Sequence, residues 1–497
     1  MFLSGRPGHG SIRLFDAGRP AYGQPIVVRI VHIGCRDAAR VAARGSAGQR
    51  VGAYDFRMSD ETARSIEIRR PTDAEIPAFI DVVGAAFGEL LTEAEIEEER
   101  QTWEADRLFV AWAGDRPIGT SGNLTFGLTT PGGAVRAAGV TLVGVVPGER
   151  RRGVLVAMMR ALLDDATAHA EPVAILWASE GAIYQRFGFG LGTFVGSFEL
   201  PRSRARFLRP VEPVGRVRLV TADEAMVAFP PIFDSVVPSI PGAVKRREAT
   251  WRYSVVADNT HGRTEYGPKF RALLEVDGVP AGYAVYRTRA EWDDRGPKGA
   301  LTVLEVIGAT PAAEMELWSW LCSMDLFPTI RGRRTSVPHP LQLALAEPRA
   351  LGLVVNDGIW LRLVDLPAAL AARRYAPDTS LVLDVTDAFL PANSGCWRLA
   401  VDANGVGTAT RVTAAGPEAS GAPTTPTLEA SGAPPSEASG APDLALDIAD
   451  LAACYLGAVR PSELARAGRV RELIPGALAR ADRCFGAERA PWCSLSF

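Results

Sequence analysis

The stretch that decides the fold reads Val143-Gly144-Val145-Val146-Pro147-Gly148-Glu149-Arg150-Arg151-Arg152-Gly153-Val154-Leu155. An apolar strand, 140–146, ends in a loop of arginine and glycine, and an apolar helix follows over about 152–169. The first N–H groups of a helix lack partners and its dipole is positive there, so the geometry suits a pyrophosphate. Gly153 would let the backbone approach the phosphates. The competing interpretation is a solvated basic turn before a helix.

Regular elements surround this loop on both sides. The pattern predicts a strand at 65–69, a helix beginning at Thr72–Asp73 and running through Phe87, and an acidic helical stretch over 89–99. Segments 108–113 and 118–125 flank a Gly-Asp-Arg-Pro turn and predict a β-hairpin. A buried strand, 173–178, follows the helix. These alternating elements predict an α/β unit.

The same pattern partly recurs further along the chain. Segments 270–276 and 281–287 repeat the hairpin, 301–307 repeats the strand 140–146, and 311–322 repeats its helix. We therefore expect an internal duplication of one fold. The second copy has only Gly308-Ala309-Thr310-Pro311 after its strand, without arginines, so the chemistry belongs in the first copy.

A third region runs from about residue 375 to the end, with strands expected at 381–385, 397–401 and 444–448 and helices after 449 and near 475. Within it, Glu-Ala-Ser-Gly-Ala-Pro occurs at 418–423, 429–434 and 437–442. Such repeats bury too little apolar area to order themselves, so 414–442 is predicted to be a disordered insertion. Residues 1–63 are predicted to be a disordered extension, with a genuine N-terminal arm as the alternative.

Composition excludes several classes of protein. Among 497 residues, 54 basic and 57 acidic side chains nearly balance, which argues against a protein organised around nucleic acid. No apolar run is long enough to span a membrane, and no signal peptide is evident. The six cysteines form neither a Cys-x-x-Cys pair nor a Cys/His cluster, so we expect reduced thiols and no metal. A cytoplasmic enzyme fits these features.

A second motif follows the strand 173–178. It reads Ala178-Ser179-Glu180-Gly181-Ala182-Ile183-Tyr184-Gln185-Arg186-Phe187-Gly188-Phe189-Gly190. The loop Arg150-x-x-Gly153 resembles the acyl-CoA pyrophosphate loop of GNAT acetyltransferases, although Leu155 replaces the usual small residue. Loop and motif together resemble the Eis (enhanced intracellular survival) family.

The resemblance implies an α/β (α+β) architecture. Two tandem GNAT folds, of which only the first binds acetyl-CoA, would be followed by a sterol-carrier-protein-like domain. The bounds expected here are 64–205 for the catalytic domain, 206–372 for the second domain and 373–497 for the third. The family resemblance also implies a homo-oligomer, specifically a hexamer.

The resemblance carries functional roles onto single positions. Tyr184 would be the general acid that protonates the departing CoA thiolate, since a tyrosine pKa near 10 lies close to that of a thiol. The carboxylate of the last residue, Phe497, would be the general base, acting through positioning, desolvation or a water relay. The acetyl-CoA contacts would come from Val143, Gly144, Val145, Arg151, Arg152, Gly153, Val154, Leu155, Val156, Ser179 and Glu180.

The amine pocket is expected at Phe87, Glu89 and Leu142, with Trp103 as a weaker candidate. Glu89 would attract a cationic amine and Phe87 would pack on its carbon skeleton. Five further acidic residues could steer polyamines or aminoglycosides, but a solvated helix face is the favoured interpretation of them. These are Glu93, Glu95, Glu97, Glu98 and Glu99.

The sequence therefore predicts an acetyl-CoA-dependent N-acetyltransferase. Its substrate would be a primary amine, either a small molecule of the aminoglycoside or polyamine type or a lysine-bearing peptide. The alternative is a non-catalytic acyl-CoA or lipid-binding protein that works through the third domain. A weaker alternative is a partner-binding module that uses the repeats as a tether.

Overall fold

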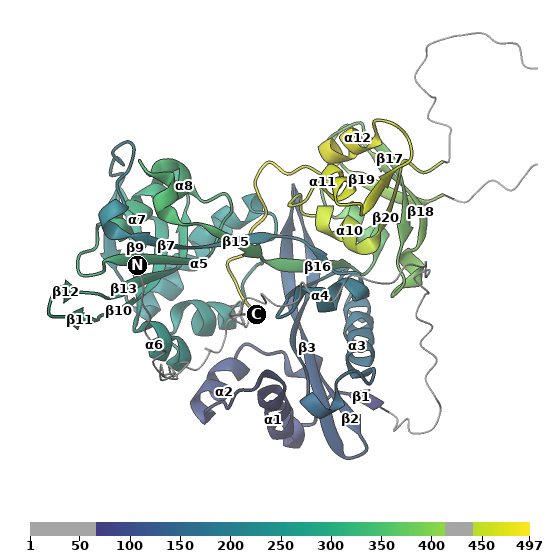
Figure 1. Cartoon of the computed structure of the whole chain (residues 1–497), viewed down its shortest axis with the longest axis horizontal. Helices are drawn as coiled ribbons and strands as arrows, with labels where there is room; N and C mark the ends of the chain where they lie inside the picture. Colours follow the sequence, from purple (N-terminus) through teal and green to yellow (C-terminus); the bar gives the residue numbers. More distant parts are fainter. Residues whose placement is uncertain (1–65, 413–440) are drawn as a thin grey trace, which may run out of the picture.

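The computed structural model describes residues 66–412 and 441–497, which form three α/β domains (Figure 1). The extension expected at 1–63 lies outside the described residues, as does the repeat insertion expected at 414–442 apart from its last two residues. Two seven-stranded sheets and one five-stranded sheet organise the chain. The mixed α/β class is thus confirmed.

The first domain is built on a sheet in the order β1-β2-β3-β4-β5-β16-β6. Its first two helices follow capping boxes, which Thr72 and Glu75 form before α1 and Thr92 and Glu95 form before α2. The strands are β1 (Ile66–Arg69), β2 (Leu108–Ala113), β3 (Arg116–Thr130), β4 (Gly133–Val145), β5 (Val173–Trp177), β16 (Ile359–Leu363) and β6 (Gly190–Leu191). The helices are α1 (Ile76–Phe87), α2 (Glu93–Arg100), α3 (Val154–Ala168) and α4 (Gly181–Tyr184).

The second domain repeats this arrangement in the order β15-β7-β14-β13-β10-β9-β8. In each copy an antiparallel meander leads through a helix to a parallel strand, which confirms the predicted duplication. The strands are β7 (Phe194–Pro201), β8 (Arg216–Leu219), β9 (Lys269–Val276), β10 (Val279–Arg289), β13 (Ala300–Gly308), β14 (Thr329–Thr335) and β15 (Val354–Asp357), with a ribbon of β11 (Trp292–Asp293) and β12 (Gly296–Pro297). The helices are α5 (Ala222–Val236), a π-helix (Thr250–Val256), α6 (Thr260–Tyr266), α7 (Pro311–Ser323) and α8 (Pro340–Ala344).

The first two domains exchange strands. β7 follows the first domain in sequence but lies between β14 and β15 of the second sheet, and β16 returns from the second domain to lie between β5 and β6 of the first. The expected boundary at 205/206 therefore does not divide the two sheets. This exchange was not visible in the sequence, because both strands carry ordinary apolar patterns that fit either sheet.

The third domain has a sheet in the order β19-β18-β17-β20-β21 and docks on the exchanged strand β16. Its helix α10 lies so close to β6 that a Cβ on Gly190 would overlap the carbonyl oxygen of Ala449 and come within 2.6 Å of the nitrogen of Ala453. The elements are β17 (Ser380–Thr386), β18 (Gly395–Val401), β19 (Gly407–Arg411), β20 (Leu444–Asp447), β21 (Val470–Glu472), α9 (Leu366–Ala371), α10 (Ile448–Cys454), α11 (Pro461–Arg466) and α12 (Ala477–Cys484).

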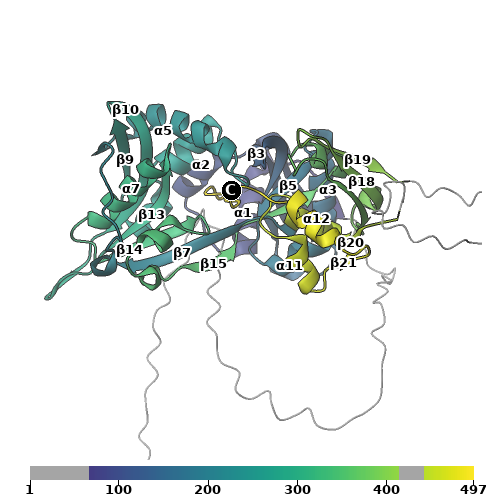
Figure 2. The same ribbon diagram turned by 90° about the horizontal axis from the view of Figure 1, so that it is seen from above.

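The chain then leaves α12 and returns toward the other two domains. Its last residues run between them, so that the C-terminus lies at the centre of the molecule (Figures 1 and 2). A buried ion pair, Arg362–Asp387, joins the exchanged strand to the third domain.

Gly190→Ala is expected to lower the free energy of unfolding by about 3 kcal/mol, because the new methyl group meets backbone atoms that cannot rotate away. Gly127→Ala is the matched control, since its Cβ would meet only the Cβ of Lys245, at an ordinary 3.7 Å. Thermal unfolding of the two variants checks this. Equal melting temperatures would show that α10 does not require glycine at position 190.

Candidate active site

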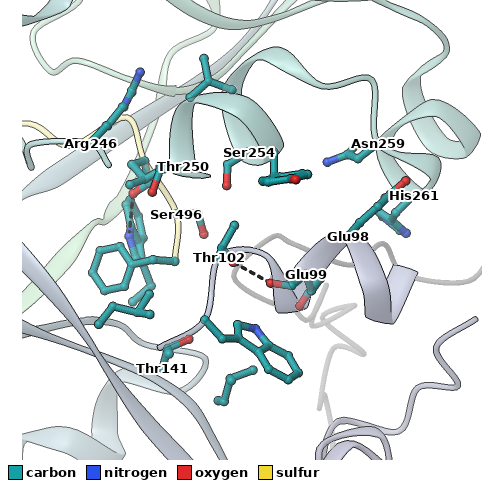
Figure 3. A pocket seen from close by; sticks show the side chains of 18 of the residues that line it. Glu98, Glu99, Thr102, Thr141, Arg246, Thr250, Ser254, Asn259, His261 and Ser496 are labelled. Atoms are coloured by element: carbon teal, nitrogen blue, oxygen red, sulfur yellow. Dashed lines mark hydrogen bonds between the residues drawn. The ribbon is translucent and has the colours of Figure 1, made fainter. Parts of the chain in front are cut away.

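A cavity of about 330 Å³ lies where the three domains meet, and all three contribute to its wall (Figure 3). The first domain contributes Val83, Phe87, Glu89, Glu95, Glu98, Glu99, Thr102, Trp103, Leu124, Phe126, Val140, Thr141, Leu142, Val143, Trp177, Ser179 and Tyr184. The second contributes Arg246, Arg247, Thr250, Tyr253, Ser254, Val255, Asn259, His261, Val285, Leu304, Glu305 and Arg334, and the tail contributes residues 494–497. The expected residues Phe87, Glu89, Leu142, Val143, Ser179, Tyr184 and Phe497, and the weaker candidate Trp103, are thus brought together.

The floor of the cavity is the part of β4 that extends beyond its pairing with β5. β4 and β5 pair in parallel only from Ala137 to Gly139, and β4 then continues without β5. At Leu142 the backbone turns to a positive φ of 55° and the register with β3 shifts, which makes a bulge in β4. The hydroxyl of Thr120 donates a hydrogen bond to the Leu142 carbonyl, 3.0 Å away, and so holds the bulge. The exposed edge of β4 can therefore pair with an extended ligand arm.

The arginine loop lies at the far end of this open strand. Gly153 has a φ of 83° and caps α3 without any side chain, which leaves the N–H groups of Val154, Leu155 and Val156 directed at the loop. Arg151 also has a positive φ, 63°, and its side chain is exposed. These features fit a pyrophosphate, which needs backbone donors and positive charge.

The three arginines differ in what they contact. Arg150 donates to the carbonyls of Val145 and Ala86, so it ties the loop to β4 and α1. Arg152 pairs with Glu149, which also pairs with Arg116. The motif arginine Arg150 therefore positions the loop, and all three arginines are exposed to solvent.

Tyr184 ends the short helix α4 on the cavity side, with its ring buried against Phe189. Burial, and after it the charge of Glu180, raises the pKa of Tyr184 to about 12. The hydroxyl is therefore protonated at neutral pH and has a proton to donate, although its pKa is higher than the value near 10 expected from the sequence. Ser179 lines the cavity, whereas Glu180 is exposed just outside it.

The C-terminal tail reaches into the same cavity. The ring of Phe497 packs on that of Phe126, with centroids 4.8 Å apart, and its edge would lie 3.2 Å from a Cβ on Gly139. The indole N–H of Trp177 donates to the carbonyl of Leu495, 2.9 Å away. The last residue is thereby held beside the point where β4 leaves β5.

The opposite wall is acidic and half-buried. Glu95, Glu98 and Glu99 of α2 line the cavity together with Glu89, whereas Glu93 and Glu97 point to solvent. The solvated-face interpretation is therefore wrong for three of the five. The pKa of Glu99 is raised to about 7, mainly by burial. The charges of Glu89, Glu95 and Glu98 add to this rise, and the neighbouring His261 opposes it.

The second domain supplies a wall that the sequence did not predict. Glu98 accepts hydrogen bonds from the N–H and hydroxyl of Thr260 at the start of α6, which closes the cavity over α2. Arg246 forms a buried ion pair with Glu305, and Arg247 pairs with Glu104 of the first domain. The only signal was the basic and aromatic run from Arg246 to Tyr253, and nothing local in it indicates a partner 150 residues earlier.

Three domain models match this chain. Acetyltransferase (GNAT) domain models match residues 67–192 and 242–363, and a sterol carrier protein domain model matches 366–494. An N-acetyltransferase of Streptomyces avermitilis is 37% identical over 425 residues, covering 84% of this chain and 96% of that protein. N-acetyltransferase Eis of Mycobacterium tuberculosis is 30% identical over 441 residues, covering 85% and 98%. The chain belongs to the Eis family of GNAT N-acetyltransferases.

The solved structure of Eis1 from Mycobacterium abscessus superposes on this Eis-family chain with a TM-score of 0.70 and 28% identity, covering 87% of this chain and all of that one. The expected architecture, two GNAT domains and a sterol-carrier-type domain, is thus confirmed. The protein is an N-acetyltransferase, and its GNAT domains imply the use of acetyl-CoA. None of the described helices is long and apolar enough to cross a membrane. No cluster of three or more potential metal ligands occurs within 66–412 and 441–497.

Glu99→Gln is expected to stabilise the protein in a pH-dependent way. Because the folded-state pKa of about 7 lies above the ordinary value of 4.5, the wild type loses stability as the pH rises from 4.5 to 7. The free energy of unfolding of the variant should therefore rise relative to that of the wild type across that window, by at most about 3 kcal/mol, and the difference should stay constant outside it. Glu93→Gln, on the exposed side of α2, should show no pH-dependent gain in stability. A stability difference between Glu99→Gln and the wild type that does not change with pH would contradict the raised pKa of Glu99.

Proposed function

We propose that this enzyme transfers the acetyl group of acetyl-CoA to a primary amine that carries additional positive charge, by direct attack in a ternary complex. The observation that carries the proposal is one cavity that is lined by the open edge of β4 on one side, by Tyr184 and Phe497, and by glutamates on the other side. One cavity of this kind would hold the groups that acetyl transfer needs close to one another.

Acetyl-CoA supplies an activated thioester. Val143, Gly144 and Val145 would pair along its extended arm, and the bulge at Leu142 would turn a backbone N–H toward the thioester oxygen, in the manner of an oxyanion hole. The pyrophosphate would be held by the α3 N-terminus, through Gly153, Val154, Leu155 and Val156, with charge from Arg151 and Arg152. Ser179 would flank the opposite side of the slot, with Glu180 beyond it.

The proton balance requires two groups. A primary amine is protonated at neutral pH and must lose a proton before its nitrogen can attack. The carboxylate of Phe497 would accept this proton, directly or through a water, and pass it to solvent, and the neutral nitrogen would then form the new C–N bond. As the C–S bond breaks, Tyr184 would donate its hydroxyl proton to the departing sulfur, and the resulting tyrosinate would take the second proton, which the nitrogen loses when the amide forms. Because burial holds the pKa of Tyr184 at about 12, the hydroxyl keeps its proton until negative charge develops on the sulfur.

The acidic wall supports a substrate with more than one cationic group. Phe87 and Trp103 offer apolar surface to the carbon skeleton, and Glu89 and Glu99 offer negative charge to ammonium groups. Aminoglycosides, polyamines and lysine side chains in basic peptides share this chemistry. We also propose, from the family resemblance, a hexameric assembly, and from the unpaired thiols of the described chain a cytoplasmic location.

Tyr184→Phe and removal of Phe497 should each lower kcat at least about 100-fold, because each removes one proton-transfer group. Release of CoA thiol with kanamycin-type aminoglycosides, spermidine and a lysine peptide measures this. Full turnover without Phe497 would refute the carboxylate base, and full turnover of Tyr184→Phe would refute the acid. Tight acetyl-CoA binding without turnover on any amine would favour the acyl-CoA-binding alternative.

Glu99→Gln should raise the KM for spermidine about tenfold at pH 8 and leave it unchanged at pH 6, where Glu99 is already protonated. The KM for a monoamine such as butylamine should not change at either pH. Glu93→Gln serves as the control on the same helix. An equal effect on spermidine and butylamine would exclude a charge-specific role for Glu99.

A further inference from the structure

The second domain has a strand splay like the one that forms the active site. β13 and β14 pair in parallel only from Ala300–Thr329 to Val303–Gly332, and then separate. In the first domain the corresponding gap opens into the 330 Å³ cavity, whereas here only about 30 Å³ is left. Residues of the C-terminal tail, Trp492 and Arg489, help to line what remains.

Trp492 is firmly held at this position. Its indole N–H donates to the carbonyl of Arg334, 2.7 Å away, and its backbone N–H donates to that of Pro241, 2.8 Å away. Its side chain is 9% exposed and belongs to the core that includes Ile240 and Ile307. A buried, doubly hydrogen-bonded tryptophan is an anchor rather than part of a loose terminus.

From this anchor the chain crosses directly to the first domain. Arg246 donates to the Ser494 hydroxyl at 2.9 Å, Trp177 donates to the Leu495 carbonyl at 2.9 Å, and Phe497 packs on Phe126. Within six residues the contacts thus pass from the second domain to the first. The tail therefore has no slack loop between its anchor and its end.

The spacing makes the position of the terminus depend on the anchor. A chain that slips by one residue moves by about 3.4 Å, and five residues reach at most about 17 Å. Acid–base groups lose most of their effect when they are misplaced by about 1 Å. Losing the anchor would therefore take the terminal carboxylate out of range of the amine.

We propose that Trp492 is a positioning residue for catalysis: it fills the strand splay of the second GNAT domain and thereby sets the depth to which the Phe497 carboxylate enters the active site of the first. The gap between β13 and β14 of the second GNAT domain thus holds the tail that carries the base of the first GNAT domain. This inference rests on the proposed role of Phe497.

The experiment compares the intact full-length enzyme with Trp492→Phe, Trp492→Ala and the same substitutions in a chain that lacks Phe497. Trp492→Ala should lower kcat about 30-fold or more with little change in the KM for acetyl-CoA, and Trp492→Phe should restore much of it. In the chain lacking Phe497, Trp492→Ala should cause no further loss of kcat, because the two residues act through one group.

A readout that needs no turnover is the release of the terminal residue by carboxypeptidase Y. Phe497 should be released at least tenfold faster from Trp492→Ala than from the wild type. Trp397→Phe is the matched control for Trp492→Phe, since Trp397 is also buried and its indole N–H also donates to a carbonyl, that of Asn393 at 2.8 Å. It should leave both kcat and release unchanged.

The outcomes separate this inference from the proposed function. If removal of Phe497 abolishes turnover while Trp492→Ala changes neither kcat nor release, the anchor is refuted and the base stands. If removal of Phe497 leaves turnover intact, the base is refuted, and the anchor's role in catalysis falls with it. Additive losses of kcat from Trp492→Ala and loss of Phe497 would refute the anchor's role, because Trp492 would then affect turnover by a route that does not pass through the terminal carboxylate.

Discussion

The separation of β4 from β5 after Gly139 is the constraint on which the rest of the molecule depends. A parallel pair that stops halfway leaves one strand edge with unpaired backbone groups inside the protein, which is costly unless something satisfies them. The bulge at Leu142, the arginine loop and the start of α3 all lie along this opened edge. The cavity is thus a consequence of interrupted pairing, and the apolar strand itself need not carry any catalytic side chain.

All three domains contribute to enclosing that gap. The first domain provides the strand edge and the acidic helix α2, the second closes over α2 through Thr260 and Glu98, and the third sends its tail between them. Enclosure excludes water, which strengthens every charge in the site and moves the pKa values of Tyr184 and Glu99 upward. The same burial that builds the pocket therefore sets the protonation states that its chemistry needs.

The duplication explains how such an assembly is possible. Two similar sheets can exchange β7 and β16 without loss of pairing, and this exchange makes the first two domains inseparable. It also places β16 where the third domain can dock, through Arg362 and Asp387 and through the close approach of α10 to Gly190. The glycine-rich end of the second motif therefore serves domain packing as much as the site, although it was predicted only as part of a catalytic signature.

The sequence by itself determined the local elements. Strand, loop and helix around Gly153 and the duplication follow from apolar periodicity and caps, which act over a few residues. The expectation that Phe87, Glu89, Leu142 and Tyr184 line one site came from the family resemblance that two motifs carry. Only the tertiary structure decided the strand exchange, the closing wall from Arg246 to His261, and the anchoring of the tail at Trp492. These depend on contacts between segments more than a hundred residues apart, and no local pattern of residue types encodes which distant surface a strand, an arginine or a tryptophan will meet.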